Sequence, residues 1–415
     1  MELTPGYQYS DVGVIPDDWD AKTLGEIGES LIGLTYRPSQ VRAHGTLVLR
    51  SSNVQNGGLC FEDNVFVHAN IPKRIMVRPG DILVCVRNGS RDLIGKSALI
   101  DERGVGMTFG AFMAVFRSQH GKLLHQVFQS GIFKKQINEH LGATINQITN
   151  KSLNSFKVPL PRTDEERIKI ANALGDVDAL LTAFDRIIAK KRELKQAAMQ
   201  QLLTGGTRLR GFAGEWKVKK LGDIASIVSG GTPRTTVLSY WNGGIKWCTP
   251  TDITRYSGKY LSETDRTISH AGLSSSGATL LPIGALLLCS RATIGEVKIA
   301  IAPMATNQGF KSLICRPRIS NEFIYYKLLT MKQQMIERAF GSTFLEISTR
   351  NVAALEVAMP PYEEQIAIAK ILSDMDAELS VLEARFDKIR NLKQAMMQQL
   401  LTGKTRLIIK KESHV

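Results

Sequence analysis

The sequence has few long hydrophobic runs. Its apolar segments are short, such as DILVCV and ALLLC, and none reaches the roughly 18 consecutive apolar positions that a membrane-spanning helix needs. The N-terminal stretch MELTPGYQYSDVGVIPDDWD has no basic start followed by an apolar core, which argues against a secretory signal. We therefore expect a cytoplasmic protein with no membrane partner.

Cysteine is also scarce. The 415 residues include five cysteines, an odd number, and none of them forms a C-x-x-C pair. This composition excludes a disulfide framework and a zinc knuckle as the basis of the fold. We expect reduced and mostly buried thiols.

Catalytic motifs are missing as well. MPPY (359–362) is similar to the Asn/Asp-Pro-Pro-aromatic motif of amino-group methyltransferases, but Met359 replaces the group that would accept a hydrogen bond from the target amine. TGKT (402–405) ends like a phosphate-binding loop, yet Gln398 occupies the position of its first glycine. The seven histidines show no ligand spacing. The sequence therefore predicts no catalytic residue, no metal site and no cofactor bound by this chain.

The chain is, in contrast, rich in positive charge. Its formal net charge is +14 and its isoelectric point is about 9.5. Lysine and arginine that neutralise phosphates release condensed counterions, so this charge suits a polyanion partner. Many basic proteins bind no nucleic acid, and charge alone leaves the question open.

A fifteen-residue string occurs twice, as KQAAMQQLLTGGTRL (195–209) and KQAMMQQLLTGKTRL (393–407). The match extends outward with less identity: EERIKIANALGDVDALL aligns with EEQIAIAKILSDMDAEL, and DDWDAKTLGEI with GEWKVKKLGDI. The last alignment superposes Trp19 on Trp216. The repeat unit is therefore half of the chain, and the two halves diverge between these segments.

Each half ends in a long helical pattern. Apolar residues step by three and four positions from Leu174 to Ile188 and again from Leu372 to Ile389, as in a coiled coil. Each pattern begins with Glu-Glu and ends at Leu-Thr-Gly, so each predicts a helix of about 40 residues, or about 60 Å. Two matching seams favour helices that pack against each other, antiparallel. Packing of each helix on its own globule alone stays open.

The segments at roughly 17–160 and 214–358, which we call the first and second globules, are predicted to be rich in β-strand. RPGDILVCVRNGSRDLIGKSALI and LPIGALLLCSRATIGEVKIAI both indicate a turn, a buried strand, a polar loop and a second strand. HQVFQSGIFKKQINEHL and EFIYYKLLTMKQQMIERAF each predict one helix per globule.

In this order of parts the chain resembles the specificity subunits (HsdS) of type I restriction-modification systems. The string LKQAxMQQLLTG at the end of both helices is the most family-like feature, and the globule starts, W followed by LG-[ED]-I, support it. The resemblance covers the whole chain and implies an α+β fold of two target recognition domains related by a pseudo-two-fold repeat, whose long helices form an antiparallel coiled coil. The expected parts are target recognition domain 1 (1–161), a central helix (162–206), target recognition domain 2 (207–360), a C-terminal helix (361–404) and a basic tail (405–415).

The resemblance also implies a function. Each globule would read one half of a bipartite double-stranded DNA target, and the helices would set the spacing and dock two modification (methyltransferase) subunits. Restriction subunits, which are ATP-dependent translocases and nucleases, would join the complex. S-adenosylmethionine, ATP and Mg²⁺ would be bound by those partners and not by this chain.

Other readings of the sequence stay open. One is a structural coiled-coil scaffold without DNA reading, in which the helical repeat persists only because packing partners constrain each other. Another is a fragment of a fused restriction-methyltransferase, against which the missing motifs argue.

Base readout needs polar or cationic side chains on loops that can enter a groove. Four loop regions of each globule meet this requirement, and Arg87 aligns with Arg291 as Arg37 does with Arg234, which suggests shared phosphate contacts; residues that differ between the halves are better candidates for reading sequence. The candidates in the first globule are Arg37, Arg50, Ser52, Asn53, Gln55, Arg87, Asn88, Ser90, Arg91, Lys96 and Thr108. Those in the second are Arg234, Thr251, Arg255, Ser290, Arg291, Thr293, Lys298, Thr306, Asn307 and Gln308.

Overall fold

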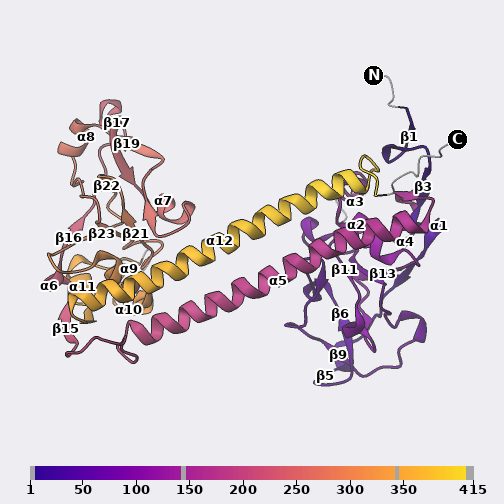
Figure 1. The fold of residues 1–415 in the computed structure, drawn as a ribbon, viewed down its shortest axis with the longest axis horizontal. Coiled ribbons are helices and arrows are strands. Elements are labelled where there is room, and N and C mark those ends of the chain that lie inside the picture. Colours follow the sequence, from indigo (N-terminus) through magenta and orange to yellow (C-terminus); the bar gives the residue numbers. More distant parts are fainter. Residues whose placement is uncertain (1–4, 142–145, 342–344, 408–415) are drawn as a thin grey trace. The chain divides into compact units, whose positions relative to one another are not determined.

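The computed structural model describes residues 5–141, 146–341 and 345–407. It divides into two compact units, one formed by residues 1–184 and 385–415 and the other by residues 185–384 (Figure 1). Each unit contains one globule and parts of two long helices. Most of the predicted basic tail, residues 408–415, lies outside the described residues.

The two long helices form as the sequence predicts. Helix α5 (Asp164–Leu202) and helix α12 (Tyr362–Leu400) contain 39 residues each, which corresponds to about 58 Å. Both have acidic residues in the first turn, where they complement the positive end of the helix dipole. Gly205 and Gly403, just beyond the ends, adopt left-handed φ values of 75° and 69°.

In each unit the beginning of one long helix packs against the end of the other. In the first unit Ile170 and Leu174 of α5 share a hydrophobic cluster with Leu400 of α12. In the second, Leu202 of α5 shares a cluster with Leu372 of α12. The helices therefore pack antiparallel, as the sequence predicted, and every predicted seam residue is buried or half-buried.

Both copies of the fifteen-residue repeat begin with a lysine that pairs with an aspartate of the other helix. In the first unit Lys393 Nζ lies 2.6 Å from Asp178 Oδ1, and Lys393 is buried. In the second unit Lys195 pairs with Asp376. These pairs add charge complementarity to the apolar seam.

The first globule is built on two four-stranded sheets and three two-stranded ribbons. The larger sheets have the orders β11-β10-β13-β4 and β12-β6-β9-β5, and the ribbons are β1-β2, β14-β3 and β7-β8. The strands are β1 (Tyr7–Ser10), β2 (Gly13–Pro16), β3 (Trp19–Thr23), β4 (Glu29–Ile32), β5 (Val41–Arg42), β6 (Thr46–Leu49), β7 (Val54–Gln55), β8 (Gly58–Leu59), β9 (Phe66–Val67), β10 (Ile82–Cys85), β11 (Ser97–Leu99), β12 (Thr108–Phe109), β13 (Met113–Arg117) and β14 (Lys157–Pro161). The short helices are α1 (Leu24–Ile27), α2 (Gly121–Gln129), α3 (Gly131–His140) and α4 (Asn150–Ser155).

The second globule has a five-stranded sheet, β16-β23-β20-β21-β18, a three-stranded sheet, β19-β17-β22, and the ribbon β15-β24. The strands are β15 (Lys217–Lys220), β16 (Ala225–Ser229), β17 (Trp241–Cys248), β18 (Tyr260–Leu261), β19 (Arg266–Ile268), β20 (Leu286–Leu288), β21 (Val297–Ala300), β22 (Met304–Thr306), β23 (Lys311–Cys315) and β24 (Glu356–Met359). The short helices are α6 (Leu221–Ile224), α7 (Pro250–Arg255), α8 (His270–Ser274), α9 (Asn321–Thr330), α10 (Lys332–Glu337) and α11 (Thr349–Ala353).

The two globules share a strand arrangement despite their divergent sequences. Strand β10 pairs antiparallel with β11 and β13, as β20 does with β21 and β23. Strand β6 pairs in parallel with β12, as β17 does with β22. The predicted order of buried strand, polar loop and strand is therefore confirmed in both halves.

The prediction of one helix after the sheets of each globule is wrong, because each segment forms two helices. In the first globule the break falls at Ser130, whose hydroxyl accepts a hydrogen bond from the backbone N–H of Ile132 and so caps α3. In the second globule α9 ends at Thr330 and α10 begins at Lys332.

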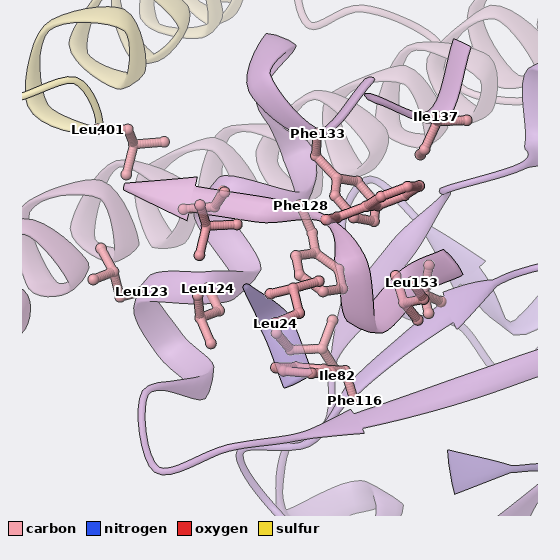
Figure 2. Packing of buried hydrophobic residues seen from close by; sticks show 14 of the residues in the cluster. Leu24, Ile82, Phe116, Leu123, Leu124, Phe128, Phe133, Ile137, Leu153 and Leu401 are labelled. Atoms are coloured by element: carbon pink, nitrogen blue, oxygen red, sulfur yellow. The ribbon is translucent and has the colours of Figure 1, made fainter. Parts of the chain in front are cut away.

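The core of the first unit lies between helices α2 and α3, the sheet that contains β10 and β13, and the ends of the two long helices. Figure 2 shows Phe128 and Phe133 side by side, and their rings stack with centroids 4.2 Å apart. Leu401, just beyond the end of α12, belongs to the same cluster as Leu24 of the globule start. The end of the second repeat copy is therefore part of the core of the first globule.

Candidate nucleic-acid interface

The predicted loops of the first globule meet at one surface. Asn88, after β10, lies 3.5 Å from the hydroxyl of Ser51, after β6. Leu34 forms a parallel bridge with Gly110, after β12, and the carbonyl of Phe112 accepts hydrogen bonds from the loop after β10. Residues 33–37, 50–55, 87–91 and 108–112 therefore form one surface, which we call the first loop surface.

The second globule brings the corresponding loops together around Gly309. A side chain at Gly309 would lie 3.5 Å from Pro250 and 3.9 Å from the Cβ of Arg291. The neighbouring Gln308 accepts a hydrogen bond from Thr232. Residues 230–234, 249–255, 290–293 and 306–309 form the second loop surface.

The candidates from the sequence differ in exposure. The exposed ones are Arg37, Gln55, Arg87, Ser90, Arg91, Arg234, Thr251, Arg255, Arg291 and Gln308. The half-buried ones are Arg50, Ser52, Asn88, Lys96, Thr293 and Asn307. The buried ones are Asn53, Thr108, Ser290, Lys298 and Thr306. Only the first two groups have side-chain surface that is open to solvent in this structure.

Two of the buried candidates of the first globule support its backbone. The amide oxygen of Asn53 accepts a hydrogen bond from the N–H of Arg50, and its amide nitrogen donates to the carbonyl of Cys60. Thr108 donates its hydroxyl proton to the carbonyl of Ile75 over 2.8 Å. These side chains hold the loops in place and point into the globule.

In the second globule Lys298 has a similar supporting position. Its ammonium group donates to the carbonyl of Gly258, and burial lowers its pKa below the ordinary value. Ser290 and Thr306 are 0% and 2% exposed. Ser290 follows β20 and Thr306 ends β22, and all residues of both strands are buried.

Several candidate arginines are already paired with groups of the chain. Arg255 forms an ion pair with Asp265, and Arg50 with Asp63 at 2.7 Å. Arg91 donates to the carbonyls of residues 138 and 141. A phosphate contact by any of these would have to replace an existing interaction.

The aligned arginines Arg87 and Arg291 differ in whether they are paired with a carboxylate. The Arg87 guanidinium lies 5.1 Å from the centre of the Phe112 ring and has no ion pair among the described residues. Arg291 lies 2.5 Å from Glu346 Oε2, and Lys311 pairs with the other oxygen at 3.3 Å. Arg87 therefore carries an uncompensated charge where Arg291 is neutralised.

The pKa of Glu346 reflects this pairing. Burial by itself would raise the pKa of its carboxyl group, but the hydrogen bonds from Arg291 and Lys311 lower the pKa below the ordinary value. Glu346 is thus a carboxylate at neutral pH. It offers the second loop surface a negative charge at the position where the first has Gln147 opposite Arg87.

Two surface residues escaped the sequence analysis. Phe112 is 60% exposed on the first loop surface, and Arg266 stacks 3.8 Å from the ring centre of Trp241. A phenylalanine between apolar neighbours is expected to be buried, so Phe112 was not a candidate. Arg266 lies in strand β19, outside the predicted loops. The flanking glycine and alanine of FGAFM were the available signal that Phe112 follows a turn.

No cluster of three or more His, Cys, Asp or Glu side chains suited to a metal ion is found in the described part of the chain. All five cysteines are free, three of them buried and two half-buried. Burial raises the pKa of the Cys289 and Cys315 thiols to about 12, so they are inert at neutral pH. Among the described helices, none combines the length and the apolar character that a membrane crossing requires.

Comparison with known proteins covers both halves of the chain. The model of the type I restriction modification DNA specificity domain matches residues 16–196 and again residues 213–391. The MjaIX specificity subunit of Methanocaldococcus jannaschii is 38% identical over 164 residues, which are 39% of this chain and 38% of that protein. The putative MjaX specificity subunit of the same organism is 24% identical over 97% of both chains.

Solved structures show the same fold. The S subunit of a type I restriction-modification system from M. genitalium aligns with a TM-score of 0.61 at 16% identity, covering 96% of this chain and 99% of that one. A chain from work on complex assembly and conformational transition of the type I R-M system aligns with a TM-score of 0.54 at 17% identity, over 94% and 99%. With both halves matched by the domain model, the chain belongs to the type I restriction modification DNA specificity family and is a non-catalytic specificity subunit.

Proposed function

We propose that the chain reads the two halves of a bipartite DNA target, one with each loop surface, and that its long helices hold two modification subunits and the restriction subunits of the complex. The observation that carries the proposal is the contrast between the halves. The helices and their pairings are repeated, whereas the loop surfaces differ in charge and shape. Two identical partners need equal docking surfaces, and two different half-sites need different readers.

In this proposal residues 1–161 and 207–360 are the target recognition domains, and residues 162–206 and 361–404 are the helices that space them and dock partners. The exposed and half-buried candidates of the two loop surfaces supply the DNA contacts. S-adenosylmethionine, ATP and Mg²⁺ are bound by the partner subunits. The complex acts in the cytoplasm.

The outward face of the fifteen-residue repeat supports partner docking. Leu194 and Leu392, the residues directly before the two copies, occupy equivalent positions and are 49% and 56% exposed. Ala197 and Gln201, one and two turns further along α5, are exposed, and so are their equivalents in α12. Packing within the chain constrains the inward residues of the repeat, but it gives no reason for the outward residues to be identical. Binding of the same partner at each copy does give a reason.

Introducing a charge on this face tests the docking. Leu194→Glu with Leu392→Glu should reduce co-purification of modification subunits with the chain, because a carboxylate would enter an apolar contact. Ile187→Glu is the matched control, since Ile187 is 46% exposed on the same helix and aligns with Arg385. If both variants lost the modification subunits to the same extent, the repeated outward residues would not be the docking surface.

A globule exchange tests DNA reading. Replacing residues 214–358 by the corresponding globule of a relative should change one half of the methylated motif, read by methylation-aware sequencing of cells with and without the gene. A change in both halves, or in neither, would contradict two independent readers. The alternative of a scaffold without DNA reading predicts no change of motif.

Binding of S-adenosylmethionine to the purified chain separates the proposal from a fused methyltransferase. Calorimetry should detect no binding to this chain alone and should detect it with the modification subunits present.

A further inference from the structure

Phe112 is an exposed aromatic residue on the first loop surface. Its backbone is fixed, because its carbonyl accepts hydrogen bonds from the N–H groups of Val86 and Arg87, each over 3.1 Å. Its side chain is 60% exposed, although the neighbouring residues of β12 and β13 are buried. The globule therefore holds an apolar ring outward at a rigid position.

The ring is accompanied by a cation. The Arg87 guanidinium lies 5.1 Å from the ring centre, within the range of a cation–π contact. Its N–H groups have no hydrogen-bond acceptor among the described residues, so they are available to an external acceptor. An apolar surface and a planar set of donors thus face outward side by side.

This pair has the chemistry of base reading in the major groove. Apolar side chains, phenylalanine included, contact the methyl group of thymine, and an arginine beside them can donate to a phosphate oxygen and fix the register. A phosphate contact alone would explain Arg87 but not an exposed ring beside it, because the ring has nothing to offer a phosphate.

We propose that Phe112 is a specificity-determining residue of the first globule and contacts the C5-methyl group of a thymine in the first half-site. The inference rests on the proposed function and adds the base that one side chain reads. Arg87 is a positioning residue for the ring, and its outward N–H groups contact a phosphate.

The second globule supports the assignment by contrast. Met113 lies opposite Cys85 and Phe310 opposite Cys289, so Gly309 is the structural equivalent of Phe112. A glycine presents no apolar surface. The two loop surfaces therefore differ at this position, as two readers of different half-sites must.

The test uses the full chain in complex with its modification subunits. Methylation-aware sequencing first gives the target, and DNA probes then carry deoxyuridine in place of each thymine of the first half-site in turn. Deoxyuridine lacks only the C5-methyl group. At one position the affinity of the wild-type complex should fall about fourfold, the change expected when one methyl group leaves an apolar contact.

Phe112→Ala should bind the thymine and deoxyuridine probes equally at that position, and Phe112→Leu should restore part of the discrimination. Because the ring is exposed, neither substitution should change the thermal midpoint of unfolding. Phe340→Ala is the matched control: Phe340 is a 58% exposed phenylalanine of the second globule and should leave discrimination in the first half-site intact.

The outcomes are distinct. A wild-type complex that tolerates deoxyuridine at every position, or a Phe112→Ala variant that still discriminates, overturns the inference and leaves DNA reading standing. Loss of modification subunits from the Phe112→Ala complex would assign the ring to a protein contact and also overturn it. A wild-type complex that does not prefer its target to scrambled DNA would refute the proposed function itself.

Discussion

Arg406, near the end of the second repeat copy, donates to the two carboxylate oxygens of Glu166 over 2.5 and 2.9 Å. Glu166 lies in the first turn of α5 and is 1% exposed. Arg208, at the equivalent position of the first copy, donates to Glu364 in the first turn of α12 over 2.7 Å in each of two bonds. Each copy of the repeat thus has, directly before its last residue, an arginine that binds the beginning of the other long helix.

A tryptophan completes each arrangement. Trp19 donates to Glu166 over 3.1 Å and Trp216 to Glu364 over 3.3 Å. These are the tryptophans that align at the starts of the two globules. The start of the globule, the start of a long helix and the end of a repeat copy therefore meet at one buried carboxylate in each unit. Because both units use this arrangement, its tryptophan, glutamate and arginine occur in both halves of the sequence.

Removing the arginine should destabilise the first unit. Arg406→Ala leaves the buried Glu166 carboxylate without its main partner, and we expect the free energy of unfolding of that unit to fall by about 3 kcal/mol. Arg406→Lys should recover only part of this, because lysine cannot donate through a planar fork. Chemical denaturation measures both.

The matched control for this prediction is Arg390→Ala. Arg390 pairs with Asp387 on the surface of α12, the helix that ends shortly before Arg406, and both side chains are about 60% exposed. Exposed pairs contribute little to stability. If the two alanine variants unfolded alike, the buried carboxylate would not be the reason for the repeated arginine.

His125 should make the stability of the first unit depend on pH. Burial lowers its pKa from 6.5 to about 4, and its Nε2 lies 3.0 Å from the carbonyl of Gly57, with Asp178 and Lys393 nearby. As pH falls from about 6.5 to about 4, the unfolded chain protonates this imidazole while the folded chain keeps it neutral. The free energy of unfolding should therefore fall by about 3 kcal/mol across that window.

His125→Gln should remove this component of the pH dependence, and the exposed His68 provides the control substitution, His68→Gln. Denaturant unfolding at a series of pH values gives the comparison. The prediction is contradicted if the stability of the wild-type protein changes no more steeply between pH 6.5 and 4 than the stability of His125→Gln.

The aligned arginines should differ in their effect on DNA affinity. Arg87→Ala should weaken binding to all sequences and reduce the slope of log K against log salt by about 1, as loss of one phosphate contact does. Arg291→Ala should change the slope less, because Glu346 already neutralises it. Glu346→Gln should raise affinity for nonspecific DNA. Fluorescence anisotropy at several salt concentrations distinguishes these outcomes, and loss of discrimination at a single base pair would make either arginine a base reader.

The long helices should set the unread spacer of the target. Inserting four residues into α5 between 184 and 185, and four into α12 between 384 and 385, adds about 6 Å to each helix, or roughly two base pairs. Seven residues in each keep the 3,4 seam and should add about 10 Å and roughly three base pairs. Both insertions leave the pairings inside each unit unchanged.

The methylated motif of cells expressing each variant with its partners gives the spacer length. Both half-sites should stay the same. Insertion into α5 alone should be poorly tolerated, because α12 would then no longer match it. An active variant with the original spacer would show that another feature sets the distance.

The sequence by itself determined the repeat, the two long helices and the order of strand and loop in each globule. These features depend on local information: apolar spacing of three and four along a helix, acidic first turns, and glycines such as Gly205 that accept a left-handed φ. The break at Ser130 was local too, but the apolar periodicity on either side of it concealed the cap.

Only the tertiary structure decided what each polar side chain does. Asn53 and Thr108 have the residue types of base readers, yet their partners are carbonyls of chain segments 7 and 33 residues away. Arg291 and Arg87 occupy aligned positions two residues after a buried cysteine, and a glutamate 55 residues further along neutralises only the first. Exposure of Phe112 likewise depends on which strands surround it. Burial and charge pairing arise from contacts between distant segments, so no local pattern can state them.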